Sequence, residues 1–237
     1  MVLKTLFLGV LAAFLVAAQA QGIGDTVPAY RTQRQAGQVR LYSDIVCPRG
    51  PDGEPVVCGR PLTDQGRRAL HEFGRCLVRR DAAGSRASLA VAIEGGDYRA
   101  SLEGLVSRQR GCAASGALSF SAGLIYGVIA EALLETGGSG DALVARLKSD
   151  PGRSPVRAAN EIEYLAFCTA LTSPAEAVRL LSAPPATDEE LQAFRALVQR
   201  MSACVAAGEE LRPRRPLLRS ALAIAAYRLT AHPLAAR

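Results

Sequence analysis

The residues whose types could support chemistry are few, and they are spread along the chain. His71 precedes Cys76 by one helical turn and a residue, and a histidine beside a free thiol can activate it as a nucleophile. Glu131 interrupts the apolar run LIYGVIAEALL, where burial would raise the pKa of its carboxyl as in many acid catalysts. The densest basic group comprises Arg212, Arg214, Arg215 and Arg219.

Both catalytic hypotheses have simpler alternatives. A catalytic thiol must be free and accessible, whereas Cys76 has a candidate disulfide partner. His71 lies between the apolar residues Leu70 and Phe73, which is also typical of a histidine on a helix surface or partly packed against a core. Glu131 could mark the wet edge of a helix or a packed polar contact. A glycosidase would need a second carboxylate, for which Glu103 and Glu135 are available on paper only.

The arginine group lies at the entry to the last expected helix. The helix dipole is already positive there, so these charges do not stabilise the helix. They suggest binding of an anionic partner such as an envelope polymer, a lipid headgroup or an acidic protein, with Leu217 and Leu218 as a neighbouring apolar patch. The alternative is a solvated arginine-rich loop.

Several other kinds of site are not supported. The segment GGSGD at 137–141 does not match the G-x-S-x-G serine elbow, and Gly22 and Gly24 lack the third glycine of a dinucleotide motif. With two histidines and no C-x-x-C spacing, no metal or cofactor is expected. Aromatic residues are 5% of the chain, tryptophan is absent and the arginines are scattered, which argues against nucleic-acid binding despite the net charge of +6.

The cysteines divide most of the chain into two similar halves. Cys76 and Cys112 have the same spacing as Cys168 and Cys204, which follow 92 positions later. At this offset identical residues recur between the two cysteines of each pair. At an offset of 93, the last expected helices of the two halves also share identical residues. The identities in the first half are Cys76, Ala83, Leu89, Leu105, Val106, Arg108, Cys112, Leu124, Ala130 and Ala132. The pattern indicates a duplicated unit.

Each expected unit has four helices. In the first, Leu70, Phe73 and Leu77 mark one amphipathic helix, and a short helix at 85–93 ends at Gly95 and Gly96. A third stripe runs from Leu102 to Cys112, and a nearly apolar helix spans 120–134. The cysteines lie on the first and third stripes, so both thiols should point into one core.

The second unit repeats this order. Ser154 with Pro155 predicts a helix start, and the helix should continue to about Ala170. Capping boxes at Ser173 and Glu176 and at Thr187 and Glu190 predict the next two helices, which Pro184 and Pro185 separate. The last helix spans 216–230. We therefore predict disulfides Cys76–Cys112, Cys168–Cys204 and, by elimination, Cys47–Cys58.

The first 62 residues differ from the rest. Lys4, the apolar run from Leu6 to Ala18, and Ala20 resemble a secretory signal peptide at 1–20. The alternative is an uncleaved anchor, but this run is shorter than the roughly 20 residues that span a bilayer. Residues 21–62 are rich in Gly and Pro, and the runs VRLYSDIVC and EPVVC suggest an irregular or hairpin arm.

Three segments carry a family resemblance: FGRCLVRR, LAFC and PLLRSALAIAAYRL. They resemble exported cysteine-paired helical-repeat proteins of alphaproteobacteria, a family without an established activity. The likeness covers about 66–136 and 155–231, and not the arm. The closing helix of that family often reads LRGALAEALY. The first half keeps AEAL at 130–133, whereas the second has AIAAY, which weakens any proposal of a shared acidic site.

The expected protein is therefore all-α, with two tandem four-helix pseudo-repeats that each contain a disulfide. The boundaries are a signal peptide at 1–20, an arm at 21–62, repeats at 63–137 and 154–231, a linker at 138–153 and a tail at 232–237. We expect a periplasmic or secreted, non-enzymatic binding or structural protein whose partner is a protein or an anionic envelope component, without a membrane span after cleavage. The alternatives are a cell-envelope hydrolase with a carboxylate between the repeats, and an inhibitor or immunity-type protein.

Overall fold

The computed structural model describes residues 39–42, 62–94, 96–113, 118–138, 140–148, 158, 160–205 and 214–231. These residues are almost entirely helical, which confirms the all-α expectation at this level. The described part also contains a pair of short strands. Of the expected arm, only β1 (Val39–Tyr42) and Leu62 are described, whereas Cys47, Cys58 and the expected signal peptide lie outside the described residues.

The helices follow the predicted order in each half. The first half contains α1 (Asp64–Arg80), α2 (Ala82–Glu94), α3 (Tyr98–Arg108), the 3₁₀ turn η3 (Arg110–Cys112) and α4 (Ala122–Glu135). The second contains α6 (Glu161–Thr172), α7 (Pro174–Ser182), α8 (Asp188–Arg200), the 3₁₀ turn η4 (Met201–Cys204) and α9 (Arg215–Ala231). Between them, α5 (Gly140–Lys148) lies within the expected linker.

Local capping explains most of the helix starts. The side chains of Thr63, Ser121 and Thr187 each accept a hydrogen bond from a backbone N–H of the first turn that follows. Such bonds satisfy amide groups that have no partner within the helix. The predicted start of α8 at Thr187 is therefore confirmed together with the hydrogen bond that causes it.

Two features of the second half differ from the prediction. Its first helix, α6, begins at Glu161, because Asn160 is extended and caps the helix through Glu163 N, and the predicted start at Ser154 and Pro155 lies outside the described residues. Ser173 does precede α7, but its side chain makes no capping bond. Ser173 also ends α6, with its N–H bonded to Thr169 O, and at this shared position its ψ is 55°, whereas Thr63, Ser121 and Thr187 are extended.

The strand β1 pairs in parallel with β2 (Leu118–Ser121), which leads directly into α4. The pairing joins Val39 with Leu118 and Tyr42 with Ser121. A parallel pair requires a long crossover connection, which α1 to α3 provide. Within the described part, the first run of the arm therefore pairs with a strand distant in sequence, and the second run of the predicted hairpin, EPVVC, lies outside the described residues.

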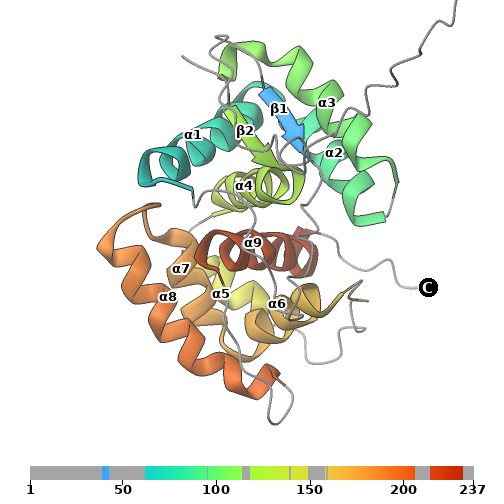
Figure 1. The fold of residues 1–237 in the computed structure, drawn as a ribbon. Coiled ribbons are helices and arrows are strands. Elements are labelled where there is room, and N and C mark those ends of the chain that lie inside the picture. Colours follow the sequence, from blue (N-terminus) through green and yellow to red (C-terminus); the bar gives the residue numbers. More distant parts are fainter. Residues whose placement is uncertain are drawn as a thin grey trace, which may run out of the picture.

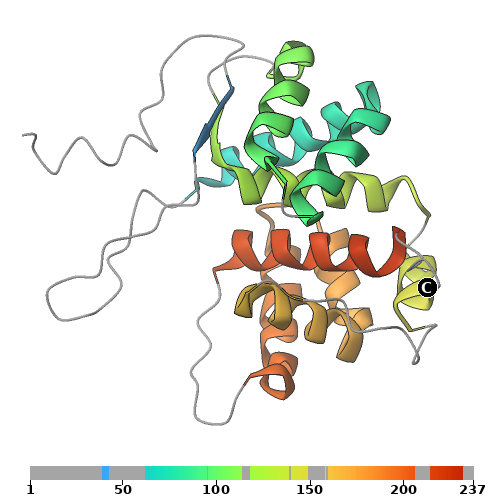
Figure 2. The ribbon, with the colours of Figure 1, turned by 90° about the vertical axis from the view of Figure 1, so that its right-hand side faces the viewer.

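Helices α4 and α9 lie side by side across the middle of the molecule (Figure 1). Helices α1 to α3 lie on the far side of α4, and α5 to α8 lie on the far side of α9, an arrangement also visible in Figure 2. Nearly every residue of α4 is buried, including Ile125, Ile129 and Leu133. The core is continuous across both halves, so α4 and α9 join them.

Gly127 permits the close approach of α4 and α9. A Cβ atom at this position would lie 2.3 Å from the Cβ of Ser220, 2.4 Å from its Oγ and 2.6 Å from its Cα. Real Cβ atoms do not approach other atoms so closely, and the Cα of Ser220 can move only with its helix. The small residue therefore sets the separation of the two helices.

Replacing Gly127 by alanine is expected to lower the free energy of unfolding by about 1–3 kcal/mol, because the two helices must move apart. Urea denaturation followed by circular dichroism measures the effect. Gly104→Ala is the matched control, since the new Cβ would meet only Arg108 Nη1 at 3.5 Å. This control should gain up to about 1 kcal/mol from helix propensity. A Gly127→Ala variant as stable as the control would contradict this account of the crossing.

Candidate functional site

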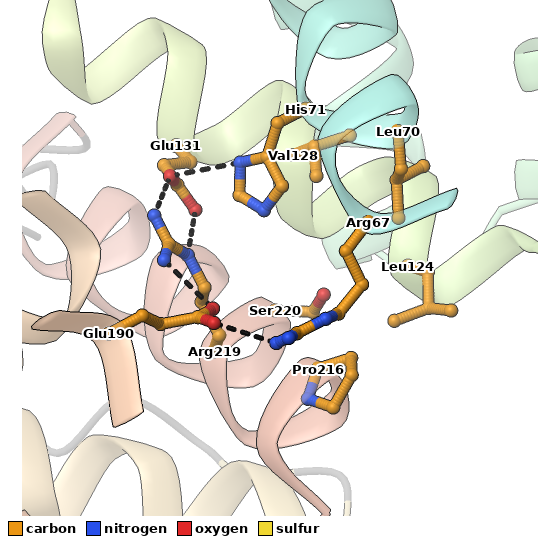
Figure 3. A pocket seen from close by; sticks show the side chains of 10 residues that line it. All are labelled: Arg67, Leu70, His71, Leu124, Val128, Glu131, Glu190, Pro216, Arg219 and Ser220. Carbon is orange, nitrogen blue, oxygen red and sulfur yellow. Dashed lines mark hydrogen bonds and ion pairs between the residues drawn. The ribbon is translucent and has the colours of Figure 1, made fainter. Parts of the chain in front are cut away.

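The most concentrated group of ionisable side chains in the described residues lies at the junction of the two halves. We call it the ion cluster, and it comprises Arg67 and His71 of α1, Glu131 of α4, Glu190 of α8 and Arg219 of α9 (Figure 3). All five side chains are buried. Four helices, two from each half, therefore contribute charge to one interior site.

Arg219 is the centre of the ion cluster. Its Nε and Nη2 donate to the two carboxylate oxygens of Glu131 at 3.0 and 2.5 Å, the bidentate arrangement that guanidinium groups favour. Its Nη1 donates to Glu190 Oε1 at 3.0 Å, and Nη2 also donates to Leu181 O at 2.9 Å. With 3% of the residue exposed, all three of its guanidinium nitrogens donate hydrogen bonds within the protein.

Glu190 gathers donors from both halves. Arg67 Nη1 donates to Glu190 Oε2 at 2.6 Å, and the backbone N–H of Ala186 donates to the same oxygen at 3.0 Å. Arg215 Nη1 lies 3.4 Å from this oxygen. Ala186 has a φ of 62°, a left-handed conformation that is unfavourable for a residue with a Cβ. The buried carboxylate thus also holds the strained turn before α8.

His71 completes the cluster on the side of α1. Its Nδ1 lies 3.2 Å from Glu131 Oε1. Burial would raise the pKa of Glu131, but the hydrogen bonds from His71 and Arg219 outweigh burial and hold that pKa below its usual value. Glu131 is therefore a carboxylate at neutral pH and cannot donate a proton as a general acid.

The space beside the cluster is small. A cavity of about 10 Å³ lies among the side chains drawn in Figure 3, and this volume is roughly that of one water molecule. Apolar and hydroxyl groups complete its wall: Leu70, Leu124, Val128, Pro216 and Ser220. The arrangement neutralises charge inside the protein and does not present reactive groups to a substrate.

The structure gives different surroundings to the three predicted anion-binding arginines that it describes. Arg214 is exposed and Arg215 is half-buried at the start of α9, whereas Arg212 lies outside the described residues. The prediction that Arg219 binds an anionic partner with them is wrong, because its guanidinium faces inward to Glu131 and Glu190. Leu218 is also in the core, so the predicted apolar patch retains only Leu217.

The remaining sequence candidates do not form a second site. Both described disulfides, Cys76–Cys112 and Cys168–Cys204, join the predicted partners, so Cys76 is not a free nucleophile. Glu135 is bound by Arg75, with Nη2 to Oε1 at 2.8 Å, and Glu103 is exposed on α3. Neither joins Glu131 in the cavity. His232 lies outside the described residues.

Neither a candidate metal site nor a candidate membrane-spanning helix occurs among the described residues. No group of three or more His, Cys, Asp or Glu side chains there could hold a metal ion. Among the same residues, no helix combines the length and apolar character needed to cross a membrane.

Arg67 and Glu190 are the cluster residues that sequence reasoning did not identify. Glu190 lies on the same helical stripe as Phe194, Leu197 and Met201, and Arg67 shares a stripe with Leu70 and His71. A charged residue on an apolar stripe is expected to be paired when it is buried. The position of Arg67 and Glu190 on apolar stripes is therefore the sequence signal that each is buried and paired, but it does not identify the partner.

Comparisons with known proteins do not identify a family for this chain. The chain matches no protein-family model, no curated protein and no solved structure.

Proposed function

We propose that the protein is an exported, non-enzymatic binding module in which the ion cluster has a structural role. The observation that carries the proposal is the internal pairing of the cluster: Arg67 bonds to Glu190, and Arg219 bonds to both Glu190 and Glu131, inside the core. A hydrolase needs an accessible acid or nucleophile. The hydrolase alternative has less support because Glu131 is a buried, doubly paired carboxylate.

Export is the second part of the proposal. The residues at 1–20 would be a cleaved signal peptide, and the mature chain would act in the periplasm or outside the cell. Two disulfides support this compartment, because such bonds persist in oxidising environments and are rare in the cytosol.

The third part is that the chain arose by duplication of a four-helix unit, at about 63–137 and 154–231. The same order of helices, 3₁₀ turn and disulfide in both halves supports it. Gly127 and Ser220 provide further support. They are equivalent under the alignment of the closing helices, and they meet where α4 crosses α9. Equivalent residues meet in this way at an isologous, twofold interface.

The binding surface that we favour is on α6. Tyr164 and Leu171 are exposed by 60% and 46%, and their spacing of seven places them on one face of the helix. Such exposed apolar groups are typical of sites that bind another protein. Leu217 and Arg214 at the start of α9 are the second candidate surface, suited to an anionic partner.

A site-specific crosslinking experiment tests the module. In one variant a photoreactive amino acid replaces Tyr164. In a control variant the same group replaces the exposed Glu72 on α1, and each variant is crosslinked separately in periplasmic extract. Partner-specific products are expected from Tyr164 alone. The same products from both positions, or none from either, would contradict a binding surface on α6. An enzyme among the captured partners would favour an inhibitor or immunity role.

A further inference from the structure

The contact between α4 and α9 raises the question of how one alignment of the two helices is selected. Both helices bury mainly alanine, leucine and isoleucine, including Ala130, Ile129, Leu222 and Ala223. Burial of apolar area is favourable but not directional. Packed helices can move past each other by one turn while keeping similar apolar contact, as in some allosteric proteins.

We propose that the ion cluster is a register lock, which selects one alignment of α4 against α9 and thereby one orientation of the two halves. Glu131 on α4 bonds to Arg219 on α9, and Arg67 on α1 bonds to Glu190 on α8. Both contacts connect the first half to the second. The lock therefore acts at the interface on which the relative position of the halves depends.

The geometry of the lock is intolerant of sliding. A movement of one turn displaces a residue by about 5.4 Å along the helix axis, whereas the Glu131–Arg219 hydrogen bonds are 2.5 and 3.0 Å long. Such a shift would separate Glu131 from Arg219 and Arg67 from Glu190, and breaking these buried charge contacts between the halves is strongly unfavourable. The correct alignment is thereby separated in energy from the neighbouring ones.

A role in register explains why charges occupy this position. Removing two ions from water opposes folding, and apolar replacements of buried ion pairs are often neutral or stabilising. Buried polar groups are best attested as devices that fix register, as a single buried asparagine does in a coiled coil. The cluster thus contributes selectivity that the apolar contact alone does not supply.

The cluster also breaks the symmetry of the interface, a step that rests on the duplication proposed above. The alignment that pairs Gly127 with Ser220 pairs Glu131 with Ile224 and Arg219 with Tyr126. Tyr126 instead donates to Tyr98 O at 2.7 Å within the first half. The ion pair therefore exists on one side of the crossing only, so exchanging the roles of the two helices cannot reproduce it.

The test replaces the charges while preserving apolar volume. The variant Arg67→Met, Glu131→Leu, Glu190→Met and Arg219→Met is prepared in the full chain with both disulfides intact. The control Arg75→Met with Glu135→Leu removes an exposed ion pair between α1 and α4, within one half. Amide NMR spectra and hydrogen exchange are measured for both, together with the melting temperature.

If the ion cluster is a register lock, the fourfold variant should stay folded but adopt more than one alignment of α4 against α9. Amides of α4 and α9 should show duplicated or broadened signals, and their protection from exchange should fall at least tenfold, while the control retains one sharp set. One sharp set with wild-type protection in the fourfold variant would overturn the proposal.

A conservative variant keeps the test decisive if the fourfold variant fails to fold. Arg219→Lys retains the charge but loses the bidentate bonds. Exchange in α4 and α9 should then rise at least tenfold relative to α2 and α7, and unchanged exchange would overturn the lock. Crosslinking at Tyr164 is measured with the lock residues intact, so the binding module and the register lock can fail separately.

Discussion

Replacing Arg219 by methionine is expected to lower the free energy of unfolding by about 3–5 kcal/mol at pH 7, the range measured when one partner of a buried ion pair is removed. Methionine fills most of the space of the side-chain stem but cannot donate a hydrogen bond. Glu131 would lose both of its bonds to Arg219, and Glu190 would lose one. Urea denaturation monitored by circular dichroism provides the measurement.

Arg215→Met is the matched control for this prediction. Arg215 also faces Glu190, but its side chain is 25% exposed and its Nη1 lies 3.4 Å from the carboxylate. Partly exposed pairs contribute about 0–1 kcal/mol, so the control should change stability little. Equal effects of the two substitutions would mean that burial of the ion cluster does not determine its contribution.

The effect of Arg219→Met should depend on pH in a defined direction. In the wild type the pKa of Glu131 is lowered, so its contribution to stability is present above the unfolded value of about 4.3 and is lost as pH falls through the folded pKa. In the variant a protonated Glu131 is easier to bury than an unpaired carboxylate. The stability difference should therefore narrow as pH falls below about 4. A difference that is constant from pH 7 to 3 would contradict the assignment to Glu131.

The helices could be predicted because their signals are local. Thr63 and Thr187 cap the helices that follow them, and Pro184 and Pro185 separate α7 from α8. Where two local signals competed, prediction was less successful. Ser154 with Pro155 and Asn160 both resemble helix starts, and the sequence does not show which one the tertiary structure uses.

The ion cluster could not be predicted because its contacts join distant segments. Glu190 and Arg67 are separated by 123 positions. Within its own segment Glu190 has an adequate explanation as a capping-box residue, and Thr187 indeed caps α8. The carboxylate instead bonds to Ala186 N and to arginines of α1 and α9. Because a capping box already accounts for Glu190, the sequence gives no reason to expect its contacts with distant helices.

The disulfides were predictable because they combine spacing with helix faces. Replacing Cys168 and Cys204 together by alanine is expected to lower the free energy of unfolding by about 4 kcal/mol, from the chain-entropy relation applied to this loop. The sequence separation is 36 residues. Urea denaturation of the variant and the wild type without reductant measures the loss, whereas full reduction of the wild type also breaks Cys76–Cys112 and should therefore lower the free energy of unfolding further.

The pair Cys76–Cys112 is a natural control, since its sequence separation is also 36 residues. If the bonds act by restricting the unfolded chain, removing either one should have the same effect within about 1 kcal/mol, because the lost loop entropy is equal. Their folded surroundings differ: Cys204 Sγ lies 3.6 Å from Thr172 Oγ1, while η3 leads through β2 directly into α4. Effects that differ by more than about 2 kcal/mol would therefore assign the stabilisation to contacts of the folded state, and not to the entropy that the two loops share.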